Sequence, residues 1–279
     1  MEVKAMPSMQ SSNLGEQSLY SVYDSKYIPT LHFGRGNAKL SQRTIHFGLP
    51  TGYTCSAWAK ECLTFANRET GKIVDAKSAC FRCWSASQEA YSPQLRAKRW
   101  SNYETLKNLS KDDMAHAISV NLYKEVSEYY ENHEQLPIVR INVSGEFFSE
   151  DYFLAWLSVV NRMQNYVDLF YAYTKALPLW IKHKENIPTN LKLRASYGGK
   201  YDHLIKEHNL PNAVVLFEDK ADIQIDHDDT KSRDPDNYHE VGLLLHGTQP
   251  KQSDASKAVQ KLKSQGFSGY SQNRKIRGK

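Results

Sequence analysis

The sequence predicts an α/β fold in which six strands alternate with helices to form a parallel sheet. Strand-like apolar runs recur between residues 44 and 245, helical segments separate most of them, and 279 residues suit one (β/α) barrel. Six repeats favour a partial or irregular barrel over a sandwich, with a doubly wound open sheet as the alternative. In both folds the loops after the strands build the functional site.

Six short apolar or alternating runs are predicted as strands. They cover residues 44–49, 138–143, 167–173, 191–196, 213–217 and 241–245. The first run alternates and ends at Pro50-Thr51-Gly52, so a loop begins directly after it. That loop leads to Cys55, which therefore follows the carboxyl end of the first strand.

Capping residues and apolar periodicity place the helices. Pro93 follows Ser92 at the first position of one helix, and Ser149 precedes two acids at the start of another, which runs to Met163. A periodic run predicts a long helix over about 112–133. Shorter helices are expected after Lys175, near residues 201–208 and, opened by Ser253, over about 255–263.

Composition and charge divide the chain into three parts. We expect an N-terminal arm over residues 1–40, a single α/β barrel domain over residues 41–265 and a basic C-terminal tail over residues 266–279. From Lys251 onward eight basic residues oppose one acid, whereas the whole chain has a net charge of +5. Such a tail either contacts nucleic acid or is a solvated terminus.

The overall composition is that of a globular protein. Hydrophobic residues make up 40% of the chain and charged residues 24%. No apolar run reaches the roughly 18 residues that span a bilayer, and the N-terminus lacks the basic and then apolar order of a signal peptide. We therefore expect a cytoplasmic protein with no membrane partner.

The four cysteines of the chain are confined to one short segment. They are Cys55, Cys62, Cys80 and Cys83. A reducing cytoplasm disfavours structural disulfides, so metal ligation or redox chemistry is the better interpretation of clustered thiols. The pair Cys80 and Cys83, two residues apart, can bring two thiolates to one metal, and the other two can complete a four-sulfur site.

The spacing of the first pair favours an iron–sulfur cluster over zinc. Structural zinc sites usually separate paired ligands by about two to four residues, whereas six residues separate Cys55 from Cys62. Iron–sulfur clusters accept irregular spacings more readily. A [4Fe-4S] cluster is therefore predicted, with zinc and ordinary or redox-active thiols as alternatives. Nearby Trp58, Arg82 and Trp84 either shield the cluster or are ordinary core and surface residues.

Polar residues recur at or just beyond the carboxyl ends of the predicted strands. They are Glu146, Lys175, Arg194, Ser196, Glu218 and His246. A barrel would bring them to one mouth, where Lys175 or Arg194 could bind a carboxylate or phosphate and a nearby acid or histidine could move a proton. Each residue taken alone is more often structural.

The segment over residues 218–240 carries nine acids and three bases. It includes Asp226-His227-Asp228-Asp229, whose side chains are of the metal-ligating type. We interpret it as a solvated acidic loop. No Walker loop, dinucleotide glycine fingerprint, His-Glu-x-x-His motif or nucleophile elbow is present in the sequence.

Several stretches between residues 36 and 200 resemble a family of phage-encoded proteins. They are residues 36–40, 48–55, 82–90, 99–102, 143–147 and 171–175. That family looks like an iron–sulfur relative of the radical S-adenosylmethionine (SAM) barrels, which have a TIM-type fold. Those barrels place a cluster after the first strand and bind SAM along the strand ends. The resemblance implies a protein of the host cell cytoplasm.

The resemblance implies a role for Glu146, because many radical SAM enzymes hold the SAM amino group with a Gly-Gly-Glu-like stretch after a strand. Here the stretch is Ser144-Gly145-Glu146, and the usual Cys-x3-Cys-x2-Cys loop is absent. A fourth cysteine would occupy the iron that SAM chelates. The leading expectation is thus a closed cluster in electron transfer, structure or another reaction, with an unknown small molecule or redox partner. A SAM-dependent enzyme and a zinc-stabilised nucleic-acid binder are the alternatives.

Overall fold

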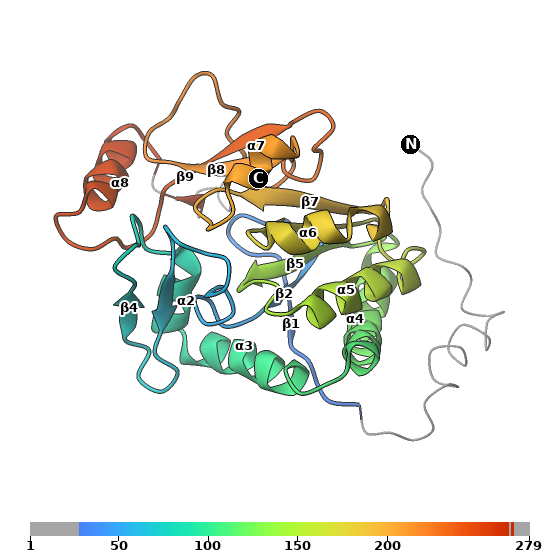
Figure 1. Cartoon of the computed structure of the whole chain (residues 1–279). Helices are drawn as coiled ribbons and strands as arrows, with labels where there is room; N and C mark the ends of the chain where they lie inside the picture. Colours follow the sequence, from blue (N-terminus) through green and yellow to red (C-terminus); the bar gives the residue numbers. More distant parts are fainter. Residues whose placement is uncertain (1–27, 268, 271–279) are drawn as a thin grey trace.

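A seven-stranded, mostly parallel sheet forms the centre of the molecule in the computed structural model, which describes residues 28–267 and 269–270 (Figure 1). Its strands lie in the order β1-β2-β5-β6-β7-β8-β9. Their bounds are β1 Phe33–Arg35, β2 Thr44–Gly48, β5 Ile138–Ser144, β6 Leu169–Thr174, β7 Leu191–Ser196, β8 Asn212–Leu216 and β9 Glu240–Leu244.

The parallel strands follow one another in space as they do in the chain. Within this sheet the neighbouring strands β2, β5, β6, β7, β8 and β9 are parallel, and only β1 is antiparallel, paired with β2. The order never reverses, which differs from a doubly wound sheet. Within the described residues β1 and β9 are the two edges, so the sheet is open. The predicted α/β class is confirmed.

Seven helices are present in the described chain, and three of them have the caps that were predicted. They are α2 Trp84–Tyr91, α3 Pro93–Leu106, α4 Lys111–His133, α5 Glu150–Arg162, α6 Leu177–Lys182, α7 His203–Glu207 and α8 Asp254–Ser264, with a 3₁₀ turn at Lys184–Asn186. Ser92, Ser149 and Ser253 each accept a hydrogen bond from the first turn of their helix. None of these helices in the described chain is long and apolar enough to cross a bilayer.

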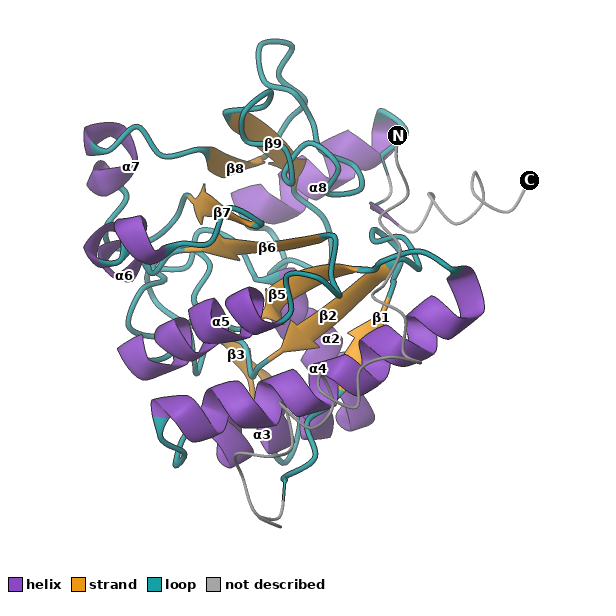
Figure 2. Cartoon of the chain, turned by 90° about the vertical axis from the view of Figure 1, so that its right-hand side faces the viewer, coloured by secondary structure: helices purple, strands orange, loops and turns teal. Residues whose placement is uncertain are grey.

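The main core lies between the sheet and the long helices α4 and α5 (Figure 2). Trp156 of α5 is fully buried and packs edge-on against Phe47 of β2, with ring centroids 5.7 Å apart. A smaller core forms around β8, β9 and α8. The cysteine segment lies next to this second core, because Cys62 and Phe81 pack against it.

Two short strands in the cysteine segment form a hairpin that the sequence did not predict. They are β3 Thr64–Ala66 and β4 Ile73–Asp75, paired antiparallel. The predicted N-terminal arm also contributes structure, because β1 joins the sheet and Leu31 is buried. Residues 1–27 of that arm and most of the predicted basic tail, residues 268 and 271–279, lie outside the described part of the chain.

Candidate metal centre

Three of the four cysteines line one cavity at the carboxyl ends of the parallel strands. The cavity has a volume of about 120 Å³. Its walls include Cys55, Cys62 and Cys83, together with the predicted site residues Glu146, Lys175 and Ser196. The loop after β2, the residues before the hairpin and the start of α2 each deliver one of the thiols. Six side chains predicted from separate parts of the sequence thus share one site.

The loop after β2 holds Cys55 through tight turns. Gly52 has a φ of +73°, and a Cβ added there would lie 2.3 Å from the carbonyl oxygen of Thr64, so only glycine fits. The Thr54 hydroxyl donates to the carbonyl of Pro50 at 2.8 Å. The carbonyl of Cys55 accepts from the amide of Ala59 at 2.8 Å. This loop is therefore rigidly defined before any ligand is considered.

Cys83 is the residue at the N-cap of α2. Its sulfur lies 3.7 Å from the Thr51 hydroxyl. Behind it the buried Arg99 donates to Glu89 at 2.9 Å, and Glu89 accepts from the Thr51 amide at 3.0 Å. Glu89 therefore joins α2 to the loop after β2 through a hydrogen bond and to α3 through a buried ion pair.

Cys80 does not share the cavity. It is exposed, its sulfur lies 3.9 Å from the carbonyl of Ser78, and it is not among the residues that line the cavity walls. The main-chain amide of Cys80 nevertheless donates to the carbonyl of Glu61 at 2.8 Å. This hydrogen bond keeps the main chain of Cys80 next to the residue that precedes Cys62. Three of the four predicted ligands therefore line the cavity, and the fourth, Cys80, is a nearby surface thiol.

Burial controls the protonation of the cavity thiols. It raises the pKa of Cys55, and the nearby charges of Glu146, Cys83 and Cys62 raise it further. Burial also raises the pKa of Cys62, although the Lys175 ammonium opposes the shift. Both thiols are therefore protonated at neutral pH unless a positive charge binds between them, and metal binding there would release protons.

Glu146 and Lys175 place a carboxyl group and an ammonium group on the cavity wall. Glu146 is 5% exposed and accepts from the Thr174 hydroxyl at 2.8 Å and from the Lys175 amide at 2.7 Å. Burial raises its pKa, opposed by these hydrogen bonds. The Lys175 ammonium donates to the Ser196 hydroxyl at 2.6 Å. A polar ligand with both an amino and an acidic group would meet complementary partners here.

Arg194 was predicted as a site residue, but it does not line the cysteine cavity. It is 1% exposed, and its guanidinium donates to five main-chain carbonyls. These belong to Asn212, Lys231, Ser232, Tyr238 and His239. The guanidinium therefore fixes the connection between β8 and β9 and does not face the cysteine cavity.

The other two strand-end candidates also lie elsewhere. Glu218 forms an exposed ion pair with Lys261 at 2.9 Å. His246 stacks on Trp84 with ring centroids 5.0 Å apart, in a second cavity beside the first. Of the aromatic and basic neighbours of the cysteines, Trp84 lines the cavity, whereas Arg82 pairs with Asp75.

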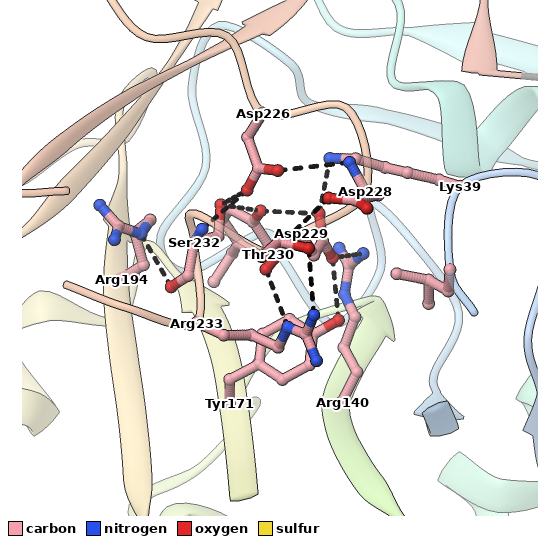
Figure 3. Close-up of polar contacts among 12 residues, drawn as sticks. Lys39, Arg140, Tyr171, Arg194, Asp226, Asp228, Asp229, Thr230, Ser232 and Arg233 are labelled. Atoms are coloured by element: carbon pink, nitrogen blue, oxygen red, sulfur yellow. Dashed lines mark hydrogen bonds and ion pairs between the residues drawn. The ribbon is translucent and has the colours of Figure 1, made fainter. Parts of the chain in front are cut away.

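The acidic segment between β8 and β9 is only in part the solvated loop that its composition predicted, because acids such as Asp219 and Asp222 are exposed but two others are buried. Asp226 and Asp229 are 1% and 0% exposed. Asp229 accepts from Arg140 and from Lys39, each at 2.6 Å, as Figure 3 shows. It also accepts from the Tyr171 hydroxyl at 3.0 Å. These contacts hold the segment against β5, which carries Arg140, and β6, which carries Tyr171.

The charges around Asp229 decide its ionisation. Burial alone would raise its pKa, but Arg140 and Lys39 hold it well below the ordinary range. The carboxylate is therefore ionised and compensated by two cations. No sequence signal marked this contact, because Lys39, Arg140 and Asp229 are widely separated in the chain.

The described residues contain no group of three or more His, Cys, Asp or Glu side chains arranged to hold a single metal ion. Sulfurs that bind different corners of a four-iron cluster lie farther apart than sulfurs that share one zinc ion. Three thiols that line one cavity are the soft donors available there to a metal.

Comparison with known proteins identifies a family that the chain matches. A family model described as gene product 88 matches residues 31–262, which include all four cysteines and all the parallel strands. No curated protein and no solved structure matches the chain.

Proposed function

The chain belongs to the gene product 88 family, and we propose that it binds a [4Fe-4S] cluster through Cys55, Cys62 and Cys83, with the fourth iron open to ligands. One observation carries the proposal: these three thiols line one cavity and Cys80 does not. Three cysteines leave one iron without a thiolate, so that iron can bind a small molecule. This favours the SAM-type enzyme over a closed electron-transfer cluster.

The polar residues of the cavity support an amino-acid group as the ligand of that iron. Glu146 supplies a carboxyl group and Lys175 an ammonium group at the same wall. These groups complement the amino and carboxylate groups of SAM. When bound, the cluster would supply one-electron chemistry, while the chain's own residues orient the ligand and exclude water.

The fold gives further support to a radical-SAM-like partial barrel. The six parallel strands are wound in one direction, and the site lies at their carboxyl ends after the first of them. Barrel enzymes carry their sites at this face. We therefore propose a partial barrel whose open edges are β1 and β9.

A closed four-cysteine cluster is the second candidate. The main chain of Cys80 is hydrogen-bonded to Glu61, next to Cys62, so this thiol is already close to the segment that delivers a ligand. If Cys80 turns inward, every iron has a thiolate, and the cluster would serve electron transfer or stability.

Anaerobic purification with iron, sulfide and zinc analysis tests the proposal. We expect brown protein with about four irons per chain. Cys55→Ala, Cys62→Ala and Cys83→Ala should each lose most of the iron, whereas the matched control Cys80→Ala should keep it. Colourless protein with one tightly held zinc would overturn the cluster assignment.

The electron paramagnetic resonance spectrum of the reduced protein separates the two candidates. With three cysteine ligands, SAM should shift the spectrum of the wild-type cluster, and Glu146→Ala should weaken the shift. An unchanged wild-type spectrum, together with a response in Cys80→Ala alone, would identify Cys80 as the fourth ligand and favour the closed cluster.

A further inference from the structure

A second cavity lies beside the cysteine cavity and shares a wall with it. Its volume is about 310 Å³, and Trp84, Ser85, Arg140, Val143 and Leu243 line both cavities. A molecule in the second cavity would therefore lie next to the proposed cluster. Small-molecule sites in proteins have volumes of about 300–1,000 Å³, so one compact ligand fits here.

The second cavity occupies the gap between the two edges of the open sheet. Asn37, Ala38 and Lys39, which connect β1 to β2, form one side. Leu243 of β9 and His246 beyond it form the other side. A closed barrel would pair its first and last strands and leave no such gap. The second cavity therefore brings residues from both ends of the open sheet to one site.

Aromatic rings form part of the cavity wall. Trp84 and His246 are stacked with an interplanar angle of 21°, and Tyr270 meets His246 edge-on at 4.9 Å. Burial and the nearby Lys39 lower the pKa of His246 to about 4, so its ring is neutral at physiological pH. A flat ring system can pack on such a wall, and a neutral imidazole can donate or accept a hydrogen bond.

The charged groups that line the second cavity are positive. Lys39 and Arg140 are lining residues, and no described Asp or Glu lines the cavity. Their carboxylate partner Asp229 is fully buried outside the lining (Figure 3). The Lys39 ammonium also lies 4.8 Å from the centre of the Tyr270 ring. A ligand in the cavity therefore meets two cations close to aromatic surface.

We propose that the second cavity binds the substrate, and that the substrate is a small planar ring carrying a phosphate or carboxylate group. This inference rests on the proposed function, because it places the substrate against the cluster cavity. The ring would pack on the aromatic wall, and the anionic group would bind at Lys39 and Arg140. The amino-acid part of SAM would occupy the other cavity, next to Glu146 and Lys175.

Binding to the full-length chain tests this assignment without any turnover. Calorimetry and tryptophan fluorescence would compare AMP and nicotinate with their uncharged counterparts adenosine and nicotinamide, and with inorganic phosphate. We expect AMP or nicotinate to bind saturably, and the matching uncharged compound and phosphate to bind at least about tenfold more weakly. Stronger binding of AMP would identify a phosphate ligand, and stronger binding of nicotinate a carboxylate ligand.

Two variants address the cavity in different ways. Lys39→Gln removes a cation, and Ala38→Trp fills space without changing charge. Each should weaken binding at least about tenfold, whereas Lys182→Gln on α6 and Ala221→Trp in an exposed loop should not. Thermal unfolding of every variant would show that the fold is retained.

Several results would overturn the assignment. These are no saturable binding of either charged compound at millimolar concentration, equal binding of the uncharged counterpart or of phosphate, or no effect of Ala38→Trp in a folded variant. Titrations with iron-loaded and iron-free chain keep the two proposals separate. Ligand binding without any cluster would refute the proposed function alone, and a cluster without ligand binding would refute this inference alone.

Discussion

Asp229 shows how much one buried residue contributes to this protein. Its carboxylate is fully buried and contacts two cations and two tyrosine hydroxyls. Removing the charge would leave Lys39 and Arg140 without their common partner. An uncompensated buried charge destabilises a fold far more than the loss of a surface pair.

We therefore expect Asp229→Asn to lower the free energy of unfolding by about 3–5 kcal/mol. The exposed Asp222→Asn in the same segment serves as the matched control and should change it by less than about 0.5 kcal/mol. Urea denaturation of the two variants measures both values. Equal free energies of unfolding for the two variants would mean that the network around Asp229 does not hold the segment in place.

The stabilisation by Asp229 also depends on pH. Its pKa in the folded protein lies below the ordinary value of 3.8, so the ionised group stabilises the fold above that pH. As the pH falls below about 3.8, the unfolded chain takes up the proton first and the stabilisation is lost. The stability gap between wild type and Asp229→Asn should therefore narrow on acidification. Urea denaturation from neutral to acidic pH measures the gap, and a widening gap would contradict this assignment.

Individual site residues could be predicted where a sequence pattern close to the residue marked it. Cysteine spacing marked the thiols, and positions after strands marked Glu146, Lys175 and Ser196. Arg194 had the same signal, but the connection between β8 and β9 covers it, and no local pattern predicts that contact. The burial of Asp229 was missed for the same reason, because acidic composition alone indicates exposure.

Elements were predicted well where caps or periodicity define them. Ser92, Ser149 and Ser253 begin α3, α5 and α8 as expected, and all six parallel strands were found. The strands β1, β3 and β4 were missed. Each has three residues, which is too short to show an alternating pattern.

The loop after β2 offers a test at the scale of one element. Gly52→Ala would force a Cβ against the Thr64 carbonyl and displace the hairpin from the loop that carries Cys55. Gly266 is a matched control, because it also has a positive φ but has nothing within 4 Å of an added Cβ. We expect Gly266→Ala to cost about 1–2 kcal/mol of stability and to keep its iron.

Gly52→Ala should destabilise the protein by clearly more than that control and should lose most of the iron, as measured by urea denaturation and metal analysis. Retention of iron in a folded Gly52→Ala protein would show that the loop can rearrange without affecting the site.

At the scale of the whole molecule, the cysteine site lies between two cores. Cys62 packs against the smaller core around β8, β9 and α8, whereas Cys55 follows β2 of the main core. A cluster bound by these thiols would join the two cores directly. The openness of the sheet was not predictable from strand patterns, because β/α alternation is the same in open and closed sheets.

Removal of the cluster should therefore lower the melting temperature by at least about 5 °C. Ligand binding to the folded state stabilises it, and this ligand connects both cores. Calorimetry of one preparation before and after anaerobic iron chelation measures the change, with Cys80→Ala treated in parallel. Identical melting curves before and after chelation would show that a bound cluster does not stabilise the contact between the two cores.

The long connection from β2 to β5 has a consequence for the order of folding. It contains the whole cysteine segment, whereas short connections join β5, β6, β7 and β8. Contacts between distant residues close slowly, because the chain must first lose the entropy of a large loop. We expect the sheet from β5 to β8 to form first and β2 to join it later. The thiols would then meet only near the end of folding, so insertion of the proposed cluster would be a late step in the maturation of this protein, and the cysteines would stay accessible to oxygen until it is complete.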